Sequence, residues 1–268
     1  MNIGLFYFSG TGMTAELAKS IANEFRRLGH TVEFTRFTAD LPLPDLAAYD
    51  VIGFGAPVYS FNAPRIFLRY LRSLDGPEGI PYVLFITSHS ASGITAASMD
   101  RILRRKRFRR TAPVIEGMGV NNIRAWRRKR DKPGHRDVFL IRGDVREWAE
   151  SALRHAAGPG TNPRLQRLRR KPGLVVFSWL FTWRWQMALV EGLRKKIDRD
   201  RCTKCGLCWE RICPSGAIRK GEDGFPEILQ RKCVGCSGCV NLCPADAVYT
   251  RINKNRWPCD IMKTNIIH

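Results

Sequence analysis

The sequence lacks several features of secreted and membrane-spanning proteins. No basic leader or small-residue cleavage site follows Met1, so we expect no secretory signal peptide. The longest apolar stretch, Gly173–Val190, contains Arg184 and is short for a membrane span. Eight of the nine cysteines lie between residues 202 and 243, unlike the scattered pairs of a disulfide-stapled domain. We therefore expect a cytoplasmic protein, with any membrane association confined to surface contact.

Acidic residues are scarce. There are 24 Asp and Glu against 45 Lys and Arg, a formal charge of +21, which indicates an anionic partner. Two basic runs, Arg104–Arg110 and Arg124–Arg130, each contain one aromatic residue. No known nucleic-acid fold accompanies them, which disfavours nucleic acid. Solvated faces, an acidic redox partner and anionic lipid headgroups remain as explanations.

The usual nucleotide motifs are also missing. There is no Gly-Lys-Ser/Thr loop and no GxGxxG in register, which disfavours nucleoside triphosphates and dinucleotides. A different loop follows the first apolar run, in FYFSGTGMTAE (Phe6–Glu16). Its glycines permit close approach, and its amides and hydroxyls can face a phosphate at a helix N-terminus. The hydroxyl donors are Ser9, Thr11 and Thr14, and the glycines are Gly10 and Gly12.

Apolar runs alternate with helical periodicity through the first 157 residues. Such alternation predicts an α/β fold with a doubly wound parallel sheet covered on both faces. The expected strands are Ile3–Phe8, Thr31–Phe37, Asp50–Ala56, Tyr82–Thr87 and Pro113–Met118, and the expected helices are Thr14–Leu28, Arg65–Leu74, Ala96–Arg107 and Asp144–Ala157.

The cysteines form an internal repeat. The first copy is Cys202–Pro214 and the second is Cys233–Pro244, each with three cysteines at two-residue gaps, a fourth cysteine and a proline. The first cysteines are 31 residues apart and the fourth are 30 apart, so the first copy has one extra residue in its last gap. We expect a wider turn or bulge to absorb it.

The second copy matches the run of bacterial two-cluster ferredoxins, in which the fourth cysteine ligates the other cluster. Zinc is disfavoured, because zinc sites usually use two separated CxxC pairs. Cross-ligation predicts Cys202, Cys205, Cys208 and Cys243 for cluster one, and Cys233, Cys236, Cys239 and Cys213 for cluster two. The segment from Asp198 to Thr250 thus resembles the bacterial-type 2 × 4Fe–4S ferredoxins. Cys259 lies outside both runs and is expected to be an ordinary thiol.

The first 157 residues resemble flavodoxins. The pattern S-x-T-G-x-T resembles the flavodoxin phosphate loop, although Met13 stands where many flavodoxins have asparagine. GFGAPVYSFNAP (Gly53–Pro64) and SHSASG (Ser88–Gly93) follow the third and fourth strands, where open α/β sheets bind ligands. The resemblance implies strand order 2-1-3-4-5 and FMN contacts from Ser9, Gly10, Thr11, Gly12, Met13, Thr14, Pro57, Val58, Tyr59, Ser60, Phe61, Asn62, Ser88, His89, Ser90 and Gly93, with Tyr59 against the ring.

The two parts together resemble a flavodoxin–ferredoxin fusion family. We expect an FMN domain at 1–157, a linker with an aromatic bridging helix at 158–197 and a small α+β ferredoxin domain at 198–268. The aromatic segment Leu174–Lys196 has two interpretations, a helix packed between the domains, which we prefer, and a membrane-surface helix.

The resemblance implies electron transfer between two 4Fe–4S clusters, FMN and a partner, which needs no nucleophile or general base. An alternative is an FMN-dependent reductase that acts on a small substrate, with the clusters as electron supply. An open apolar pocket beside Tyr59 would favour the reductase, and a covered flavin would favour carriage. A third hypothesis is a nucleic-acid-binding protein whose clusters only support folding.

Overall fold

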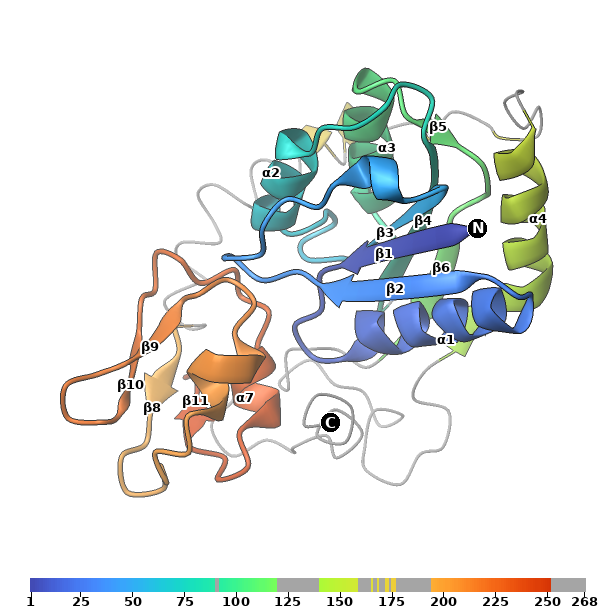
Figure 1. Ribbon diagram of the computed structural model, residues 1–268. Coiled ribbons are helices and arrows are strands. Elements are labelled where there is room, and N and C mark those ends of the chain that lie inside the picture. Colours follow the sequence, from blue (N-terminus) through green and yellow to red (C-terminus); the bar gives the residue numbers. More distant parts are fainter. Residues whose placement is uncertain are drawn as a thin grey trace.

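The computed structural model describes residues 1–89, 92–119, 140–158, 165, 168, 172–173, 175–176 and 194–251. Ser90, Cys259, the run Arg124–Arg130 and most of Leu174–Lys196 lie outside these residues. Within them, an α/β sheet domain is followed by a smaller cysteine-rich domain (Figure 1). Among the described residues, no helix has both the length and the apolar character needed to cross a membrane.

The sheet has the predicted order, with one strand in two pieces and one addition. Five parallel positions run β2-β1-β3-β4-β6, β5 also pairs with β4, and β7 adds an antiparallel edge. The fifth strand is interrupted around Pro113, which has no amide hydrogen for the ladder. The strands are β1 (Asn2–Tyr7), β2 (Thr31–Arg36), β3 (Val51–Pro57), β4 (Pro81–Ser88), β5 (Arg109–Arg110), β6 (Ile115–Met118) and β7 (Leu140–Arg142).

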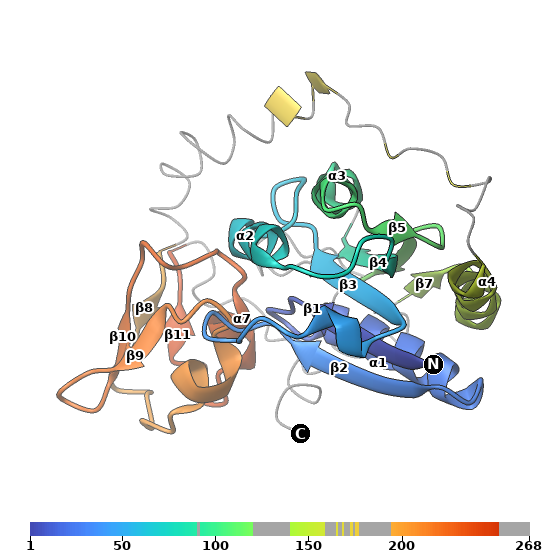
Figure 2. The ribbon, with the colours of Figure 1, turned by 45° about the horizontal axis from the view of Figure 1, so that its top comes forward.

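Helices cover both faces of this sheet, as the alternating pattern predicts. The helices α1 (Met13–Arg27) and α4 (Val145–Ala157) pack on one face, and α2 (Arg65–Ser73) and α3 (Thr95–Arg105) pack on the other (Figure 2). A short 3-10 helix, η1, spans Leu46–Ala48. Each face has its own apolar core, with Phe25 and Trp148 in the first and Phe67 and Leu103 in the second.

The cysteine-rich domain is built from two small two-stranded sheets and two short helical turns. Its elements are β8 (Lys196–Ile197), η5 (Cys208–Ile212), β9 (Ile218–Lys220), β10 (Pro226–Ile228), α7 (Gly238–Leu242) and β11 (Val248–Tyr249). The strands pair antiparallel, β9 with β10 and β8 with β11. Figure 1 shows this domain against the carboxyl ends of β1 and β2, which is the sheet edge where the predicted FMN loops begin.

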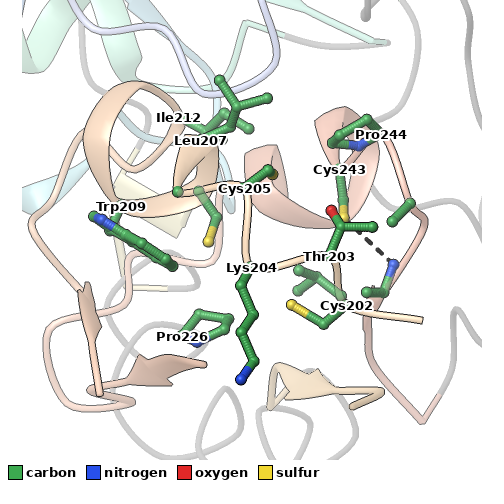
Figure 3. Close-up of a pocket in the computed structure, with 15 residues that line it drawn as sticks. Cys202, Thr203, Lys204, Cys205, Leu207, Trp209, Ile212, Pro226, Cys243 and Pro244 are labelled. Atoms are coloured by element: carbon green, nitrogen blue, oxygen red, sulfur yellow. Dashed lines mark hydrogen bonds between the residues drawn. The ribbon is translucent and has the colours of Figure 1, made fainter. Parts of the chain in front are cut away.

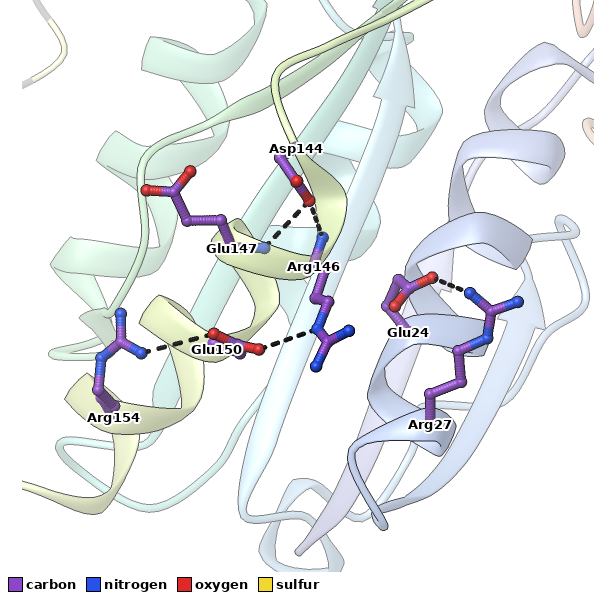
Figure 4. A network of polar contacts seen from close by, with 7 residues as sticks. All are labelled: Glu24, Arg27, Asp144, Arg146, Glu147, Glu150 and Arg154. Carbon is purple, nitrogen blue, oxygen red and sulfur yellow. Dashed lines mark hydrogen bonds and ion pairs between the residues drawn. The ribbon is translucent and has the colours of Figure 1, made fainter.

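The outer face of α1 and α4 carries charges of both signs. Glu150 accepts from Arg146 at 3.1 Å and lies 3.9 Å from Arg154. The Asp144 carboxylate caps α4 by accepting from two backbone amides. These exposed ion pairs each contribute less than about 1 kcal/mol. Figure 4 shows the network of Glu24, Arg27, Asp144, Arg146, Glu147, Glu150 and Arg154.

The basic run Arg104–Arg110 is not a uniform solvated face. Arg110 is buried and pairs with the buried Asp100 of α3 at 3.1 Å, and the Tyr82 hydroxyl donates to the same carboxylate at 2.8 Å. Arg109 donates to the carbonyls of His155 and Ala156 at the end of α4. The last two arginines therefore join β5 to the helices on both faces of the sheet.

We predict that Asp100→Asn destabilises the chain by about 3 kcal/mol, because it removes the carboxylate from a buried charge pair and leaves the Arg110 charge in place. Asparagine still offers an oxygen to the Tyr82 hydroxyl. The measurement is the urea midpoint of the full chain, followed by circular dichroism. The matched control, Glu150→Gln on the exposed network, should lose less than about 1 kcal/mol. Equal losses for the two variants would contradict the prediction.

Candidate functional site

Four cysteines line a hollow in the second domain, which we call hollow one. They are the set predicted for cluster one: Cys202, Cys205, Cys208 and Cys243. The space between these residues, including the part open to solvent, is about 360 Å³, and Leu207, Trp209 and Ile212 are among its apolar walls. Figure 3 shows the Cys202 and Cys243 side chains directed into the space between the loops. The structure thus brings the remote Cys243 to the first three-cysteine run.

The other four cysteines line hollow two. They are the set predicted for cluster two: Cys213, Cys233, Cys236 and Cys239. The space between them, including the part open to solvent, is about 320 Å³. Here the remote Cys213 of the first copy crosses to the second run. Among the described residues, no three His, Cys, Asp or Glu side chains are placed to hold a single metal ion, whereas each hollow has four thiols.

The two copies repeat the same backbone geometry around their middle cysteines. Lys204 and Gly206 flank Cys205 with φ of 54° and 83°, and Gly235 and Ser237 flank Cys236 with φ of 71° and 55°. Left-handed residues in such turns direct successive amide groups towards one side, which creates a concavity for an anion. Repetition of this strained geometry, at non-glycine residues too, indicates a functional constraint rather than a chance turn.

The remote cysteines are held in equivalent ways. The amide of Ala217 donates to the Cys213 sulfur and the amide of Ala247 donates to the Cys243 sulfur, both at 3.3 Å. In each copy the donor lies four residues after the cysteine. Amide hydrogen bonds to ligand sulfur are one of the means by which proteins adjust iron–sulfur potentials.

The extra residue of the first copy produces a π-helical turn. The segment Cys208–Ile212 is π-helical, and the Cys213 amide donates to the Cys208 carbonyl at 3.2 Å. The equivalent segment of the second copy, Gly238–Leu242, is an ordinary α-helical turn. The prediction of a wider turn is therefore confirmed, and Cys213 still reaches hollow two.

The chemistry of the two thiol sets fits a positively charged metal cluster. Burial raises the pKa of Cys208 to about 12, with further increases from Cys243, Cys205 and Cys202. A partly buried thiol among other cysteines becomes a thiolate more readily when positive charge, such as that of a metal cluster's iron, occupies the hollow.

Hollow two shows the same electrostatics. Burial raises the pKa of Cys236 to about 11, and Cys233 and Cys213 raise it further, whereas Lys195 lowers it. The Lys195 side chain is buried and lines the hollow. Sequence reasoning missed this lysine, because it lies before the cysteine motif and no pattern distinguishes it from its basic neighbours.

The phosphate loop, Ser9–Thr14, contains unused backbone donors. Ser9 Oγ accepts from the amides of Gly12 and Ala15 at 3.2 and 3.4 Å and so braces the loop. Among the described residues, the amides of Gly10 and Thr11 have no hydrogen-bond partner. They lie at the N-terminus of α1, where the first-turn amides also lack intrahelical acceptors. This donor set fits the phosphate of FMN.

The second and third predicted FMN loops are hydrogen-bonded to each other. Tyr59 and Asn62 pair across a tight turn whose central residues, Ser60 and Phe61, have φ of 49° and 65°. The Phe61 carbonyl then accepts from the Ile94 amide at 2.7 Å. A Cβ on Gly93 would lie 2.2 Å from that carbonyl oxygen, so this close approach requires glycine.

The remaining predicted FMN residues lie around these loops. Pro57 and Ser88 end β3 and β4, and the Val58 amide donates to the Thr87 carbonyl. The Thr14 and Thr87 hydroxyls are 2.7 Å apart, so Thr14 ties the phosphate loop to β4. His89 Nδ1 lies 3.1 Å from the Gly119 carbonyl oxygen, at the end of the fifth strand position.

The phosphate loop lies against hollow two. A Cβ on Gly10 would lie 2.5 Å from Cys236 Cβ and 2.6 Å from the Tyr59 hydroxyl oxygen, so only glycine fits there. A Cβ on Gly238 would lie 2.3 Å from the Gly10 carbonyl oxygen. The Tyr59 ring packs edge-on against Phe8 at 6.1 Å. Tyr59 therefore lies where the predicted FMN loops meet the cysteine loop of the second domain.

Arg36 joins the two domains at the same place. Its guanidinium donates to the Ser9 carbonyl at 3.0 Å and to the carbonyls of Arg211 and Ile212 at 2.6 and 2.8 Å. Burial lowers its pKa, and the neighbouring Cys236 acts in the opposite direction. Sequence reasoning missed Arg36, although its place at the end of β2 puts it at the ligand-binding edge of the sheet.

Two domain families match the chain. A flavodoxin domain family matches residues 4–115, and a 4Fe-4S dicluster domain family matches residues 201–248. Both matches coincide with the folded parts that hold the phosphate loop and the two hollows.

Curated relatives match about a third of the chain or less. Pyruvate synthase subunit PorD of Methanocaldococcus jannaschii is 33% identical over 86 residues, 32% of this chain and 90% of that protein. The delta subunit of NADH-dependent phenylglyoxylate dehydrogenase from Aromatoleum evansii is 38% identical over 52 residues, 19% of this chain and 54% of that protein. The chain therefore spans about half of the second relative's length.

Among solved structures, oxidised flavodoxin 1 from Bacillus cereus is 21% identical, with a TM-score of 0.41, and the match covers 59% of this chain and 95% of that one.

A flavodoxin domain implies FMN and a dicluster domain implies two 4Fe–4S clusters, and the unused loop amides and the two thiol sets fit these groups. The chain belongs to the flavodoxin–ferredoxin fusion family, in which a flavodoxin domain precedes a 4Fe–4S dicluster domain, and it is an electron-transfer protein.

Proposed function

We propose that this chain exchanges electrons internally, between two 4Fe–4S clusters and FMN, and passes them to a separate redox partner. The observation that carries the proposal is the direct contact of the phosphate loop with hollow two, at Gly10 and Cys236. This contact joins the FMN-binding edge of one domain to a cluster site of the other. When bound, the clusters supply single-electron chemistry and FMN supplies one- or two-electron chemistry, so the pair converts between the two.

The chain's own residues hold and shield these groups. The phosphate loop, Ser9–Thr14, would hold the FMN phosphate through its amides, and the loops around Tyr59 and Gly93 would flank the ring. Cys202, Cys205, Cys208 and Cys243 would hold cluster one, and Cys213, Cys233, Cys236 and Cys239 would hold cluster two.

The two hollows differ in their access to solvent. In hollow one, Cys205 and the adjoining Thr203 and Lys204 are exposed. In hollow two, Cys236 and Cys239 are only 7% and 8% exposed, and the flavodoxin domain covers part of its cysteine loop. We infer that the redox partner meets hollow one and that hollow two connects it to the flavin site.

The packing of Tyr59 supports carriage over the alternative of a reductase that binds a small substrate there. Its hydroxyl lies against Gly10 and its surroundings include Cys236, so the second domain occupies the side on which a substrate pocket was expected. Burial raises the pKa of Tyr59 well above its ordinary value, which keeps the phenol neutral. The neutral Tyr59 phenol would therefore position the loops around it.

The relatives support a protein partner, because two of them are named as subunits of a pyruvate synthase and of a phenylglyoxylate dehydrogenase. The net charge favours an acidic partner. Basic residues beside hollow one are largely paired, however, with Arg199 2.7 Å from Asp223 and Arg201 3.7 Å from Asp198. Charge attraction would therefore come from other parts of the surface.

We predict that the anaerobically purified chain contains about eight irons, about eight sulfides and one FMN. Cys213→Ala should lower the iron content while cluster one stays intact, because it removes only a hollow two thiol. Iron, sulfide and flavin counting with electron paramagnetic resonance measures this. The control Cys259→Ala should keep all the iron. Full iron in Cys213→Ala, or loss in Cys259→Ala, would contradict the ligand sets.

A second prediction concerns Arg36. Arg36→Met removes the donor to three main-chain carbonyls and should slow electron exchange between the domains about tenfold, with iron and FMN content unchanged. Stopped-flow absorbance after mixing with a reductant measures the rate, and limited proteolysis reports loosening of the domains. Arg26→Met, which removes a hydrogen bond within the flavodoxin domain, is the control. If Arg36→Met instead lost FMN while the domains kept their contact, Arg36 would support only the phosphate loop and the prediction would be wrong.

A further inference from the structure

The charged residues on the exposed side of α2 are all basic. Arg65, Arg69 and Arg72 recur at intervals of four and three residues, which places them on one side of the helix, and all three are exposed. The opposite side holds Phe67 and Leu71 against the sheet. The α2 segment contains no acidic residue.

The neighbouring helix α3 continues this surface. Arg101, Arg104 and Arg105 are exposed, and the helix's one acidic residue, Asp100, is buried and paired with Arg110. The two helices pack beside each other on the same face of the sheet (Figure 2). We call their six exposed arginines the arginine face: Arg65, Arg69, Arg72, Arg101, Arg104 and Arg105.

The opposite face of the same domain is electrically balanced. There, α1 and α4 carry basic residues interleaved with Glu16, Glu24, Glu147 and Glu150, and several are joined in ion pairs (Figure 4). Within the part of the chain that the structure describes, no ion pair joins a carboxylate to Arg69, Arg72, Arg101, Arg104 or Arg105. Among the four described helices of this domain, the excess of basic residues therefore lies on α2 and α3.

The position of the arginine face distinguishes it from the redox site. It lies on the side of the flavodoxin domain, whereas hollow one belongs to the second domain at the carboxyl edge of the sheet (Figure 1). A partner attracted to the arginine face would thus not be placed at the exposed thiols. The face is better suited to attachment than to electron exchange.

The chemistry of the face favours a lipid surface over nucleic acid or a protein. Its exposed residues include no aromatic side chain on which a base would stack, since Phe67 and Tyr70 of α2 are buried. It also offers no exposed apolar anchor of the kind that dominates protein interfaces. Two adjacent helices with six guanidinium groups match a broad layer of phosphate headgroups.

We propose that the arginine face binds an anionic phospholipid surface. Each arginine near such a surface contributes about a fivefold increase in partitioning. Attachment through α2 and α3 leaves the mouth of hollow one free for the redox partner. This inference is independent of the electron route, because it uses only residues of the flavodoxin domain's outer surface.

The experiment is co-sedimentation of the full, cofactor-loaded chain with phosphatidylcholine vesicles, with and without phosphatidylglycerol. We expect binding only to the anionic vesicles, decreasing with added salt. The test variant neutralises one set of charges: Arg69→Gln, Arg72→Gln, Arg101→Gln and Arg104→Gln. The control neutralises the same number on the opposite face: Lys19→Gln, Arg27→Gln, Arg146→Gln and Arg154→Gln.

The test variant should lose at least a hundredfold in partitioning and the control less than tenfold, with iron and FMN content unchanged in both. Equal losses would overturn the proposal, because they would show that net charge alone drives binding. If the test variant bound vesicles unchanged but no longer passed electrons to its redox partner, the face would bind a protein and the proposal would be wrong. Tighter, face-dependent binding to duplex DNA at the same salt would assign it to nucleic acid.

Discussion

The architecture depends on one buried contact, in which the arginine at the end of β2 reaches across the domain boundary. A guanidinium cannot lose its charge in a protein, so burying it requires several acceptors in fixed positions. Arg36 has three, one in the phosphate loop and two in the π-helical turn. These bonds fix the second domain against the loop, and the contact of Gly10 with Cys236 is possible only in that arrangement.

The two thiol sets illustrate how sequence spacing can determine a site. Three cysteines at two-residue gaps favour one tight loop, and the resemblance to two-cluster ferredoxins assigns the fourth cysteine of each copy to the other cluster. The structure groups all eight as this reasoning predicts, and it repeats the same left-handed backbone residues in both copies. Here short spacing along the chain, together with the ferredoxin resemblance, was enough to predict which cysteines share a hollow.

Other features depend on contacts between distant segments, and the sequence did not reveal them. The pairing of Arg110 with Asp100 divides a basic run into buried and exposed arginines, which composition alone cannot do. Strand β7 is short and its partly exposed residues give no buried-strand pattern. The parallel sheet was predictable because apolar runs alternate with helices, and its strand order was implied by the resemblance to flavodoxins. The division of the fifth strand into β5 and β6 depends on how both pieces pair with β4.

The single extra residue in the first copy also breaks the symmetry of the second domain. Because of it, the two halves of the domain have different turns immediately before their fourth cysteines. The π-helical turn of Cys208–Ile212 ends in the two carbonyls that receive Arg36, whereas the second copy forms an α-helical turn, Gly238–Leu242. The inserted residue therefore belongs to the turn that holds Arg36, in the arrangement that places hollow two beside the phosphate loop.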